Sequence, residues 1–282
     1  MNFEIDFYSE LRRLIYQIPE EKVSLIDDIA EALGDKASKS AILEILNKKE
    51  FKNLKNKIVY NYTSEKEVFK NFSSTKPLNF LKRLQENLAK KIIEKDEFEK
   101  IEHIAGVDVF YKDDLAYAAC VVLNKNFRII QVSFSTGKTR FPYIPGYLSF
   151  REIPPIKKAV EGVSDFDILM VNGHGVAHPR FFGLASHIGL DLDKPTIGVT
   201  KKRLVGKTIP KKGSWDAIVY RGRIVGANLK IYGKNNLYIS VGHKISLDTS
   251  IEIVKKFSIG CDIPEPLRIA HILSSNLGKK EF

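Results

Sequence analysis

A short apolar run that leads directly into a segment rich in glycine and histidine is the feature that most limits how this chain can fold. Residues 167–171 read DILMV, which predicts a short buried strand, and residues 171–180 read VNGHGVAHPR. The pattern becomes helical after residue 180, so these ten residues lie at a strand-to-helix turn. In a parallel sheet such turns meet at one edge, where strand ends and helix N-termini form a crevice that binds ligands. The chain is therefore expected to contain an α/β sheet with a functional site at this turn.

The residue types in this turn suit a ligand site. Gly173 and Gly175 permit a sharp turn and let a ligand approach the backbone closely. His174, His178 and Arg180 add titratable and cationic groups at the same place. A glycine-rich turn with exposed histidines is the alternative interpretation, and it explains any three of these residues more easily than all ten together.

Charge points to the class of partner. The chain has 282 residues, enough for two domains, and its 44% hydrophobic and 28% charged residues are typical of a soluble globular protein. Lys+Arg 45 against Asp+Glu 34 gives a formal net charge of +11. This excess favours a polyanionic partner such as nucleic acid, with a merely basic surface as the alternative.

Sequence signals for a membrane or an oxidising compartment are missing. No apolar run approaches the ~20 residues needed to span a bilayer, and the first residues lack the basic and apolar regions of a signal peptide. Only Cys120 and Cys261 are present, both in apolar surroundings, so neither a disulfide framework nor a nucleophilic thiol is expected. These features predict a cytoplasmic protein, and nothing indicates a membrane or a partner protein.

Residues 1–72 are expected to form a small helical domain. Apolar residues recur at helical spacing before Pro19 and again from Ile26 to a stop at Gly34. Ser38 is expected to cap a third helix. The residues that this third helix carries inward are Ala41, Ile42, Ile45 and Leu46.

Two short helices joined by a tight turn predict a helix-turn-helix that binds DNA. The second of these helices would present Ser38, Lys39 and Ser40 to the duplex. Residues 47–57 add five lysines against one glutamate, for which a solvated basic loop is the alternative.

This segment resembles the winged-helix DNA-binding half of the alkylguanine-DNA alkyltransferases. The matching stretches are IP at 18–19, KV at 22–23, DIAEALG at 28–34 and the helix from Ser38. Where that family has a Pro-Cys-His-Arg turn, residues 56–60 read NKIVY, and no cysteine occurs in the first hundred residues. Because no alkyl group can be accepted without a thiolate, the resemblance implies DNA binding only. Polar residues 73–77 are expected to be a linker, which places a second domain at residues 78–282.

The second domain begins with three β-rich runs, at residues 104–111, 116–123 and 128–134. Turn-forming residues separate them, so an antiparallel meander is expected. Asp108 lies inside the first run, where an apolar side chain would be usual. A metal, a cation or a chain end is a common reason for such an aspartate, and an exposed strand position is the alternative.

Residues 140–146 read RFPYIPG and predict a rigid apolar tip. Pro142 and Pro145 fix the backbone on either side of Tyr143 and Ile144, with Gly146 following. Such a tip can be pushed into a base stack, at a cost of a few kcal/mol per step, and a structural turn is the alternative. Glu152 follows shortly after, beside an aromatic residue and an arginine.

Two further junctions carry polar groups. The strand at residues 196–199 leads into Lys201, and residues 199–213 hold six cations and no acid. A lysine at a strand end can neutralise charge that develops on a phosphate. Residues 238–241 predict a strand, Gly242 and His243 a turn, and Ser246 the cap of the next helix.

From about residue 78 to residue 278 the chain resembles endonuclease V. The motifs, in order, are AGVDV at 105–109, PYIPG at 142–146 with FRE at 150–152, GHG at 173–175 with AHPR at 177–180, PTIGV at 195–199 leading to Lys201, LVG at 204–206 and GHKISL at 242–247. The resemblance implies a ribonuclease H-like fold, in which a mixed sheet begins with three antiparallel strands and has helices on both faces.

The resemblance also implies roles for individual residues. Asp108 and Glu152 match metal-binding carboxylates, suited to Mg²⁺ with Mn²⁺ as an alternative. His178, Lys201 and His243 match polar residues around the scissile phosphate. Residues 142–146 match the wedge that fills the gap left by an extruded base, and residues 173–175 match the turn that lines the hypoxanthine pocket.

The implied reaction is hydrolysis of the second phosphodiester on the 3′ side of deoxyinosine by metal-assisted attack of water. The implied partner is DNA with deaminated bases, duplex or single-stranded.

Asn172 departs from the pattern, since the family has a third metal-binding aspartate there. An amide oxygen can coordinate a metal, but it brings no negative charge and takes no proton. The chain is therefore an engineered inactive variant, a natural enzyme that tolerates asparagine, or a natural binder that holds inosine-containing DNA without cutting it. A nuclease acting on RNA is a third function class, because the motifs do not report on the sugar.

Overall fold

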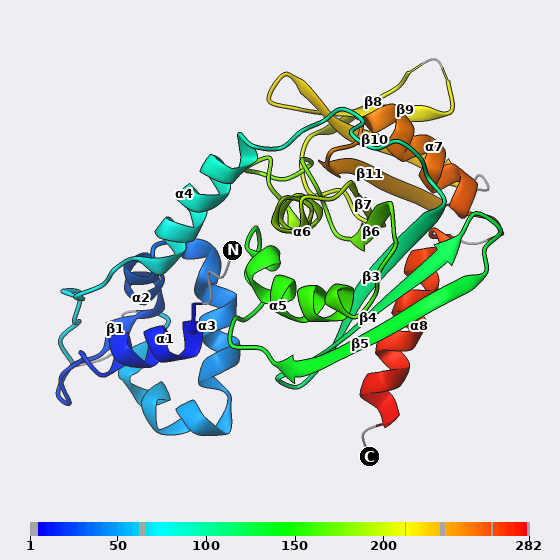
Figure 1. The fold of residues 1–282 in the computed structure, drawn as a ribbon. Helices are drawn as coiled ribbons and strands as arrows, with labels where there is room; N and C mark the ends of the chain where they lie inside the picture. The colour runs from blue at the N-terminus through cyan, green and yellow to red at the C-terminus, as the bar shows by residue number, and fades with distance from the viewer. Residues whose placement is uncertain (1–4, 62–65, 212, 232–234, 261, 281–282) are drawn as a thin grey trace. The chain divides into compact units, whose positions relative to one another are not determined.

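The computed structural model describes residues 5–61, 66–211, 213–231, 235–260 and 262–280. The chain divides into two compact units. The sheet unit contains residues 85–139 and 152–282, and the N-terminal unit contains residues 2–84 together with 140–151 (Figure 1). The domain boundaries that the sequence predicts at residues 72 and 78 stay a prediction. None of the helices in the described ranges is long and apolar enough to cross a membrane.

The sheet unit is built on a mixed sheet, which over the described residues has nine strands in the order β5-β4-β3-β6-β7-β11-β10-β9-β8. The strands are β3 (His103–Lys112), β4 (Leu115–Asn124), β5 (Ile129–Lys138), β6 (Ile168–Asn172), β7 (Thr196–Thr200), β8 (Lys207–Ile209), β9 (Trp215–Tyr220), β10 (Arg223–Ile231) and β11 (Asn235–His243). At the centre β3, β6 and β7 run parallel, which brings the carboxyl ends of β6 and β7 to one edge.

The expected meander of β3, β4 and β5 is confirmed. Asp113 adopts a φ of 53° between β3 and β4, a conformation that aspartate tolerates better than most residues. In the next turn the side chain of Asn124 accepts hydrogen bonds from the backbone N–H groups of Asn126 and Arg128. The turn residues of the sequence therefore do what their side-chain chemistry predicts.

Helices cover both faces of the sheet. They are α5 (Leu148–Glu161), α6 (Leu184–Leu192), α7 (Leu247–Phe257) and α8 (Glu265–Lys280). The Ser135 hydroxyl on β5 donates to the Pro155 carbonyl on α5 over 2.7 Å. A Cβ on Gly106 of β3 would lie 2.4 Å from the backbone of Pro266 in α8. The strand register places Ser135 and Gly106 on opposite faces of the sheet, so α5 and α8 cover opposite faces.

The N-terminal unit packs its helices around one apolar core. Its elements are α1 (Phe7–Ile15), β1 (Ser24–Leu25), α2 (Ile26–Leu33), the 3₁₀ turn η1 (Lys36–Ser38), α3 (Lys39–Leu46), η2 (Lys49–Lys57), β2 (Ile58–Val59) and the start of α4 (Pro77–Ala89). The predicted end of α2 is confirmed, since Gly34 has a φ of 99° that a side chain would disfavour. The inward residues predicted for α3 are all buried.

The predicted role of Ser38 as a helix cap is wrong. Ser38 is fully buried and its hydroxyl donates to the Asp35 carbonyl over 2.7 Å, so it is not presented to DNA either. Asp35 instead caps this joint, because its Oδ1 accepts from the Ala37 N–H at 2.9 Å. Lys39 pairs with Asp27, and Ser40 is exposed.

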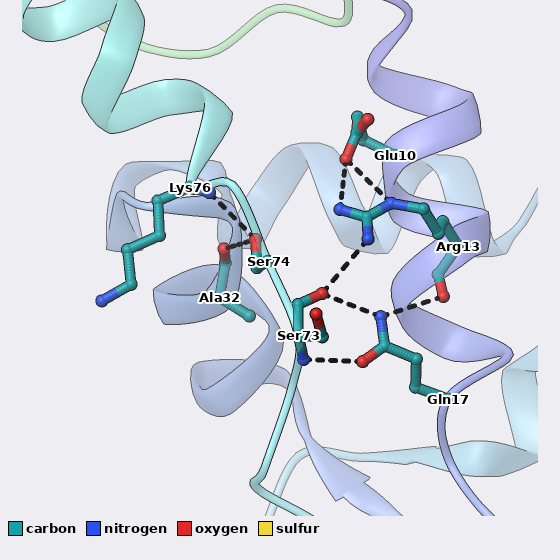
Figure 2. A network of polar contacts seen from close by, with 7 residues as sticks. All are labelled: Glu10, Arg13, Gln17, Ala32, Ser73, Ser74 and Lys76. Carbon is teal, nitrogen blue, oxygen red and sulfur yellow. Dashed lines mark hydrogen bonds and ion pairs between the residues drawn. The ribbon is translucent and has the colours of Figure 1, made fainter.

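The predicted linker has fixed partners at its start (Figure 2). The Gln17 side chain accepts from the Ser73 N–H at 2.7 Å and donates to the Ser73 carbonyl at 3.0 Å. Arg13 donates to the same carbonyl, and the Ser74 hydroxyl donates to the Ala32 carbonyl. These contacts attach residues 73 and 74 to α1 and α2.

Candidate active site

Asp108 and Asn172 meet at the centre of the sheet. Val107 of β3 lies opposite Val171 of β6 in parallel register, so the next residue of each strand projects to the same face. The Asn172 side-chain amide donates to Oδ1 of Asp108 over 2.8 Å. Asp108 is only 7% exposed, so its carboxylate depends on such hydrogen bonds.

His271 completes this group, although the sequence analysis missed it. Its Nδ1 lies 2.7 Å from Oδ2 of Asp108, so both carboxylate oxygens have a partner. His271 follows the buried Leu267 by four residues and precedes the buried Ser274 by three. That spacing on α8 was the available signal, because it places an imidazole beside the inward face of an amphipathic helix.

The donors of this group fit a divalent cation. Asp108 offers two carboxylate oxygens and Asn172 an amide oxygen, which are the donors that Mg²⁺ and Mn²⁺ prefer, and His271 adds an imidazole nitrogen beside them. Over the described part of the chain, however, no three His, Cys, Asp or Glu side chains gather in a way that could hold a metal. Glu152 lies on α5, and its role as a ligand stays a prediction.

The glycines of the 173–175 turn serve packing in this structure. Neither Gly173 nor Gly175 has a positive φ. A Cβ on Gly175 would lie 1.9 Å from the Val241 carbonyl oxygen, and one on Gly173 would lie 2.8 Å from Leu184. The close approach that these glycines allow is therefore to the protein's own backbone and side chains.

His174 is held as a neutral imidazole. Burial lowers the pKa of His174 to about 4. Its Nε2 lies 3.4 Å from the Thr200 hydroxyl, while Nδ1 is buried without a hydrogen-bond partner.

His178 and Arg180 are tied together just beyond this turn. The Nδ1 of the buried His178 accepts from the Arg180 N–H at 3.2 Å, which leaves the proton on Nε2. The Arg180 Nε donates to Oε1 of Gln85 on α4 at 2.8 Å. Gln85 in turn donates to the Phe182 carbonyl, so the guanidinium group is anchored by a buried amide.

Lys201 is exposed just past the end of β7. Val199 of β7 pairs with Asn172 of β6, and Lys201 comes two residues after Val199. The register therefore places this lysine at the same edge of the sheet as the Asp108 group. Of the cation-rich run at 199–213, residue 212 lies outside the described residues.

The structure corrects the expected place of His243. His243 is not in a turn but in β11, where it pairs with Thr196 at the start of β7. Since β11 and β7 are antiparallel, His243 lies three residues, roughly 10 Å, from the strand level of Asn172. Its Nδ1 accepts from the Ile93 N–H at 3.3 Å, and burial lowers its pKa. The register does not support a place for His243 at the scissile phosphate.

The predicted wedge at 142–146 is only partly exposed. Tyr143 is 54% exposed and Pro145 is exposed, whereas Pro142 is buried and Ile144 is 0% exposed. Ile144 is therefore a core residue of the N-terminal unit and not part of a DNA-facing tip. The expectation of an inert thiol fits Cys120, because burial raises its pKa to about 12; Cys261 lies outside the described residues.

Sequence comparison identifies the sheet unit. The endonuclease V family model matches residues 86–272. Endonuclease V of Rippkaea orientalis is 43% identical over 217 residues, covering 73% of this chain and 94% of that protein. Endonuclease V of Dictyoglomus turgidum is 42% identical over 208 residues, covering 71% of this chain and 90% of that protein.

Solved structures agree in fold. Endonuclease V from Streptomyces avermitilis is 32% identical with a TM-score of 0.66, covering 71% of this chain and 93% of that chain. Endonuclease V from Ciona intestinalis, in complex with DNA containing an inosine followed by a ribo-adenosine, is 28% identical with a TM-score of 0.64, covering 72% of this chain and 98% of that chain. The sheet unit thus has the ribonuclease H-like fold that its motifs imply. The chain belongs to the endonuclease V family of metal-dependent nucleases, which act in DNA repair at deaminated bases.

Proposed function

We propose that this protein binds DNA at deoxyinosine and hydrolyses the second phosphodiester on the 3′ side of the lesion. The contact of Asp108 with both Asn172 and His271 at the centre of the sheet carries the proposal. The Ciona relative, which has the same fold, holds inosine-containing DNA.

Asp108, Asn172 and His271 would hold the divalent cation, with Glu152 as a further ligand. Mg²⁺ suits the oxygen donors, and Mn²⁺ is the alternative because it prefers the same donors. When bound, the cation supplies stabilisation of the negative charge that develops on the phosphate. Asn172 would turn its carbonyl oxygen toward the cation and release its hydrogen bond to Asp108.

The surrounding residues would bind and orient the DNA. Lys201 and Arg180 offer positive charge to the phosphates near the lesion. His178 offers an Nε2–H donor, and the neutral His174 accepts or donates a hydrogen bond to hypoxanthine without placing a charge in the pocket.

The test compares nicking of a duplex with one deoxyinosine by the chain as given and by Asn172→Asp, with Mg²⁺ and with Mn²⁺. A third carboxylate should raise the single-turnover rate at least about 100-fold, because the amide contributes neither charge nor a proton acceptor. An undamaged duplex is the control. Equal rates for the two proteins would show that the amide is a sufficient ligand, and no cleavage by either would reject the proposal.

Binding without cleavage is the second candidate function, and Asn172 is the observation that favours it. A tight complex of the chain as given with inosine DNA, together with cleavage only after Asn172→Asp, would establish a damage-binding protein. Substrates with deoxyribose, ribose or a single ribonucleotide 3′ to inosine decide between DNA and RNA, because only a ribose offers a 2′-hydroxyl.

The N-terminal unit is proposed to be an alkyltransferase-like winged helix that adds affinity for DNA in the cytoplasm. Lys49 and Lys52 of η2 are exposed, and the Lys48 ammonium, just before η2, lies 5.5 Å from the centroid of the Tyr8 ring. Replacing all three lysines with alanine should weaken binding to every DNA sequence and lower the slope of log affinity against log salt by roughly 2 to 3. Replacing Lys22, Lys66 and Lys70, which lie outside α3 and η2, is the matched control, and an unchanged salt slope would remove η2 from the interface.

A further inference from the structure

The segment that carries the proposed wedge packs with the N-terminal unit. Residues 140–151 group with residues 2–84 by their contacts. Four of their side chains are buried in the core of that unit: Phe141, Ile144, Tyr147 and Phe150. The rings of Phe141 and Phe7 lie edge to face, with centroids 5.7 Å apart.

Polar contacts fix the same segment at both ends. At its start, the Phe7 N–H donates to the Arg140 carbonyl at 3.1 Å, and the Arg140 guanidinium pairs with Asp6 at 2.8 Å. Further on, the Tyr147 hydroxyl donates to Oδ2 of Asp35 at 2.6 Å. Tyr147 is 0% exposed, so its hydroxyl depends on this acceptor.

Asp35 lies at the joint between the two helices of the proposed helix-turn-helix. Its Oδ1 accepts from the Ala37 N–H before α3, while its Oδ2 accepts from Tyr147. One carboxylate therefore links the start of α3 to the wedge segment. Tyr143, four residues before Tyr147, is the large apolar side chain of residues 140–146 that stays exposed.

We propose that the N-terminal unit holds the base-displacing loop, residues 140–146, in a fixed position. Asp35 is a positioning residue that acts through Tyr147 to keep Tyr143 in place for insertion into the base stack. This inference rests on the proposed function. Residues 1–85 lie outside the family match, so the residues that hold the loop belong to a part of the chain that the family model does not cover. A loop fixed before DNA binds loses less conformational freedom when it inserts.

This arrangement also combines two proposed DNA contacts, the helical surface and the loop, in one compact unit. The surface of α3 and η2 and the exposed Tyr143 belong to the same unit, whereas Asp108, Asn172 and His271 belong to the sheet unit. Gripping the duplex and testing a base pair are therefore steps of one unit, and hydrolysis is a step of the other.

The experiment measures base extrusion without cleavage, using the fluorescence of 2-aminopurine placed beside deoxyinosine in a duplex. Asp35→Ala and Tyr147→Phe should each lower the fluorescence rise on binding about tenfold, the size expected when a hydrogen bond to a charged group is lost. Asp35→Asn keeps one acceptor oxygen, which can serve the Tyr147 hydroxyl or the Ala37 N–H but not both, so it should restore only part of the signal. Glu10→Gln, which alters the partner of Arg13 on α1 and not the loop, is the matched control.

A double-mutant cycle with Tyr143→Ala separates positioning from simple loss of stability. If Asp35 acts through Tyr143, the double variant should extrude the base no worse than Tyr143→Ala alone. Additive losses, or an unchanged signal in Tyr147→Phe, would overturn the inference. If Asp35→Ala does not fold, Tyr147→Phe carries the test, because it removes one oxygen and keeps the packing. Binding of inosine DNA by the parent protein without any fluorescence rise would also overturn the inference, whereas a protein that neither binds nor nicks inosine DNA would reject the proposed function.

Discussion

The two ends of the central strands each pair a histidine with an aspartate, but with opposite burial. Near the carboxyl end of β6, the Asp108 side chain is 8% exposed and the His271 side chain that contacts it is 59% exposed. At the amino end of β7, the His243 side chain is 2% exposed and the Asp193 side chain is 74% exposed, 3.6 Å away. The residue types are the same at both ends, and only their environments differ.

This difference separates a site from a structural contact. The buried Asp108 is satisfied by protein groups, and the exposed imidazole beside it remains reachable by a ligand. The exposed Asp193 is solvated and already pairs with Lys244 at 2.7 Å, a contact that lowers the pKa of its carboxyl. Burial lowers the pKa of His243, so that ring is a neutral part of the fold.

Replacing the histidine near the carboxyl end of β6 should have the largest effect on the rate of nicking. In the Asn172→Asp background, His271→Ala should lower the single-turnover rate about 10- to 100-fold, because the imidazole touches the carboxylate that would hold the cation. His243→Asn should change the rate less than about threefold, since the amide can still accept from the Ile93 N–H. Nicking of inosine DNA at saturating Mg²⁺ measures both rates. An equal loss in the two variants would break the comparison.

Part of this arrangement could be predicted from sequence. The meander followed from apolar runs separated by Asp and Asn turns, and the strand β6 followed from the short apolar run at residues 167–171. Asp108 stood out because a charged residue in a buried strand needs a partner. These are local signals, and each is contained in about ten residues of chain.

The partner of Asp108 could not be predicted in the same way. His271 lies 163 residues further along the chain, and its contact depends on how α8 packs across β3. His243 was misplaced because Gly242 looks like a turn residue, whereas β11 continues through it with an irregular register beside Thr196. The sharp turn expected at Gly173 and Gly175 was also inferred from local sequence alone. In the structure, close tertiary neighbours require glycine at these positions, and the backbone φ angles do not.

The smallest effect on nicking is expected from His187 and His243, because these two buried histidines act on folding. Burial lowers the pKa of His174 and His187 to about 4, and it lowers that of His243 as well. In the unfolded chain these rings bind protons below about pH 6.5, whereas in the folded protein they stay neutral to lower pH. The unfolded state therefore binds more protons in this window, so stability is full above pH 6.5 and falls as the pH is lowered toward 4, by up to about 1.4 kcal/mol per pH unit for His174 and for His187. Urea unfolding at pH 7.5, 6.0 and 5.0 measures this fall. His187→Leu and His243→Asn should each make this fall in stability shallower, while nicking at pH 7.5 changes less than about threefold. A fall as steep as in the parent protein would mean that the replaced ring takes up a proton as readily in the folded as in the unfolded chain.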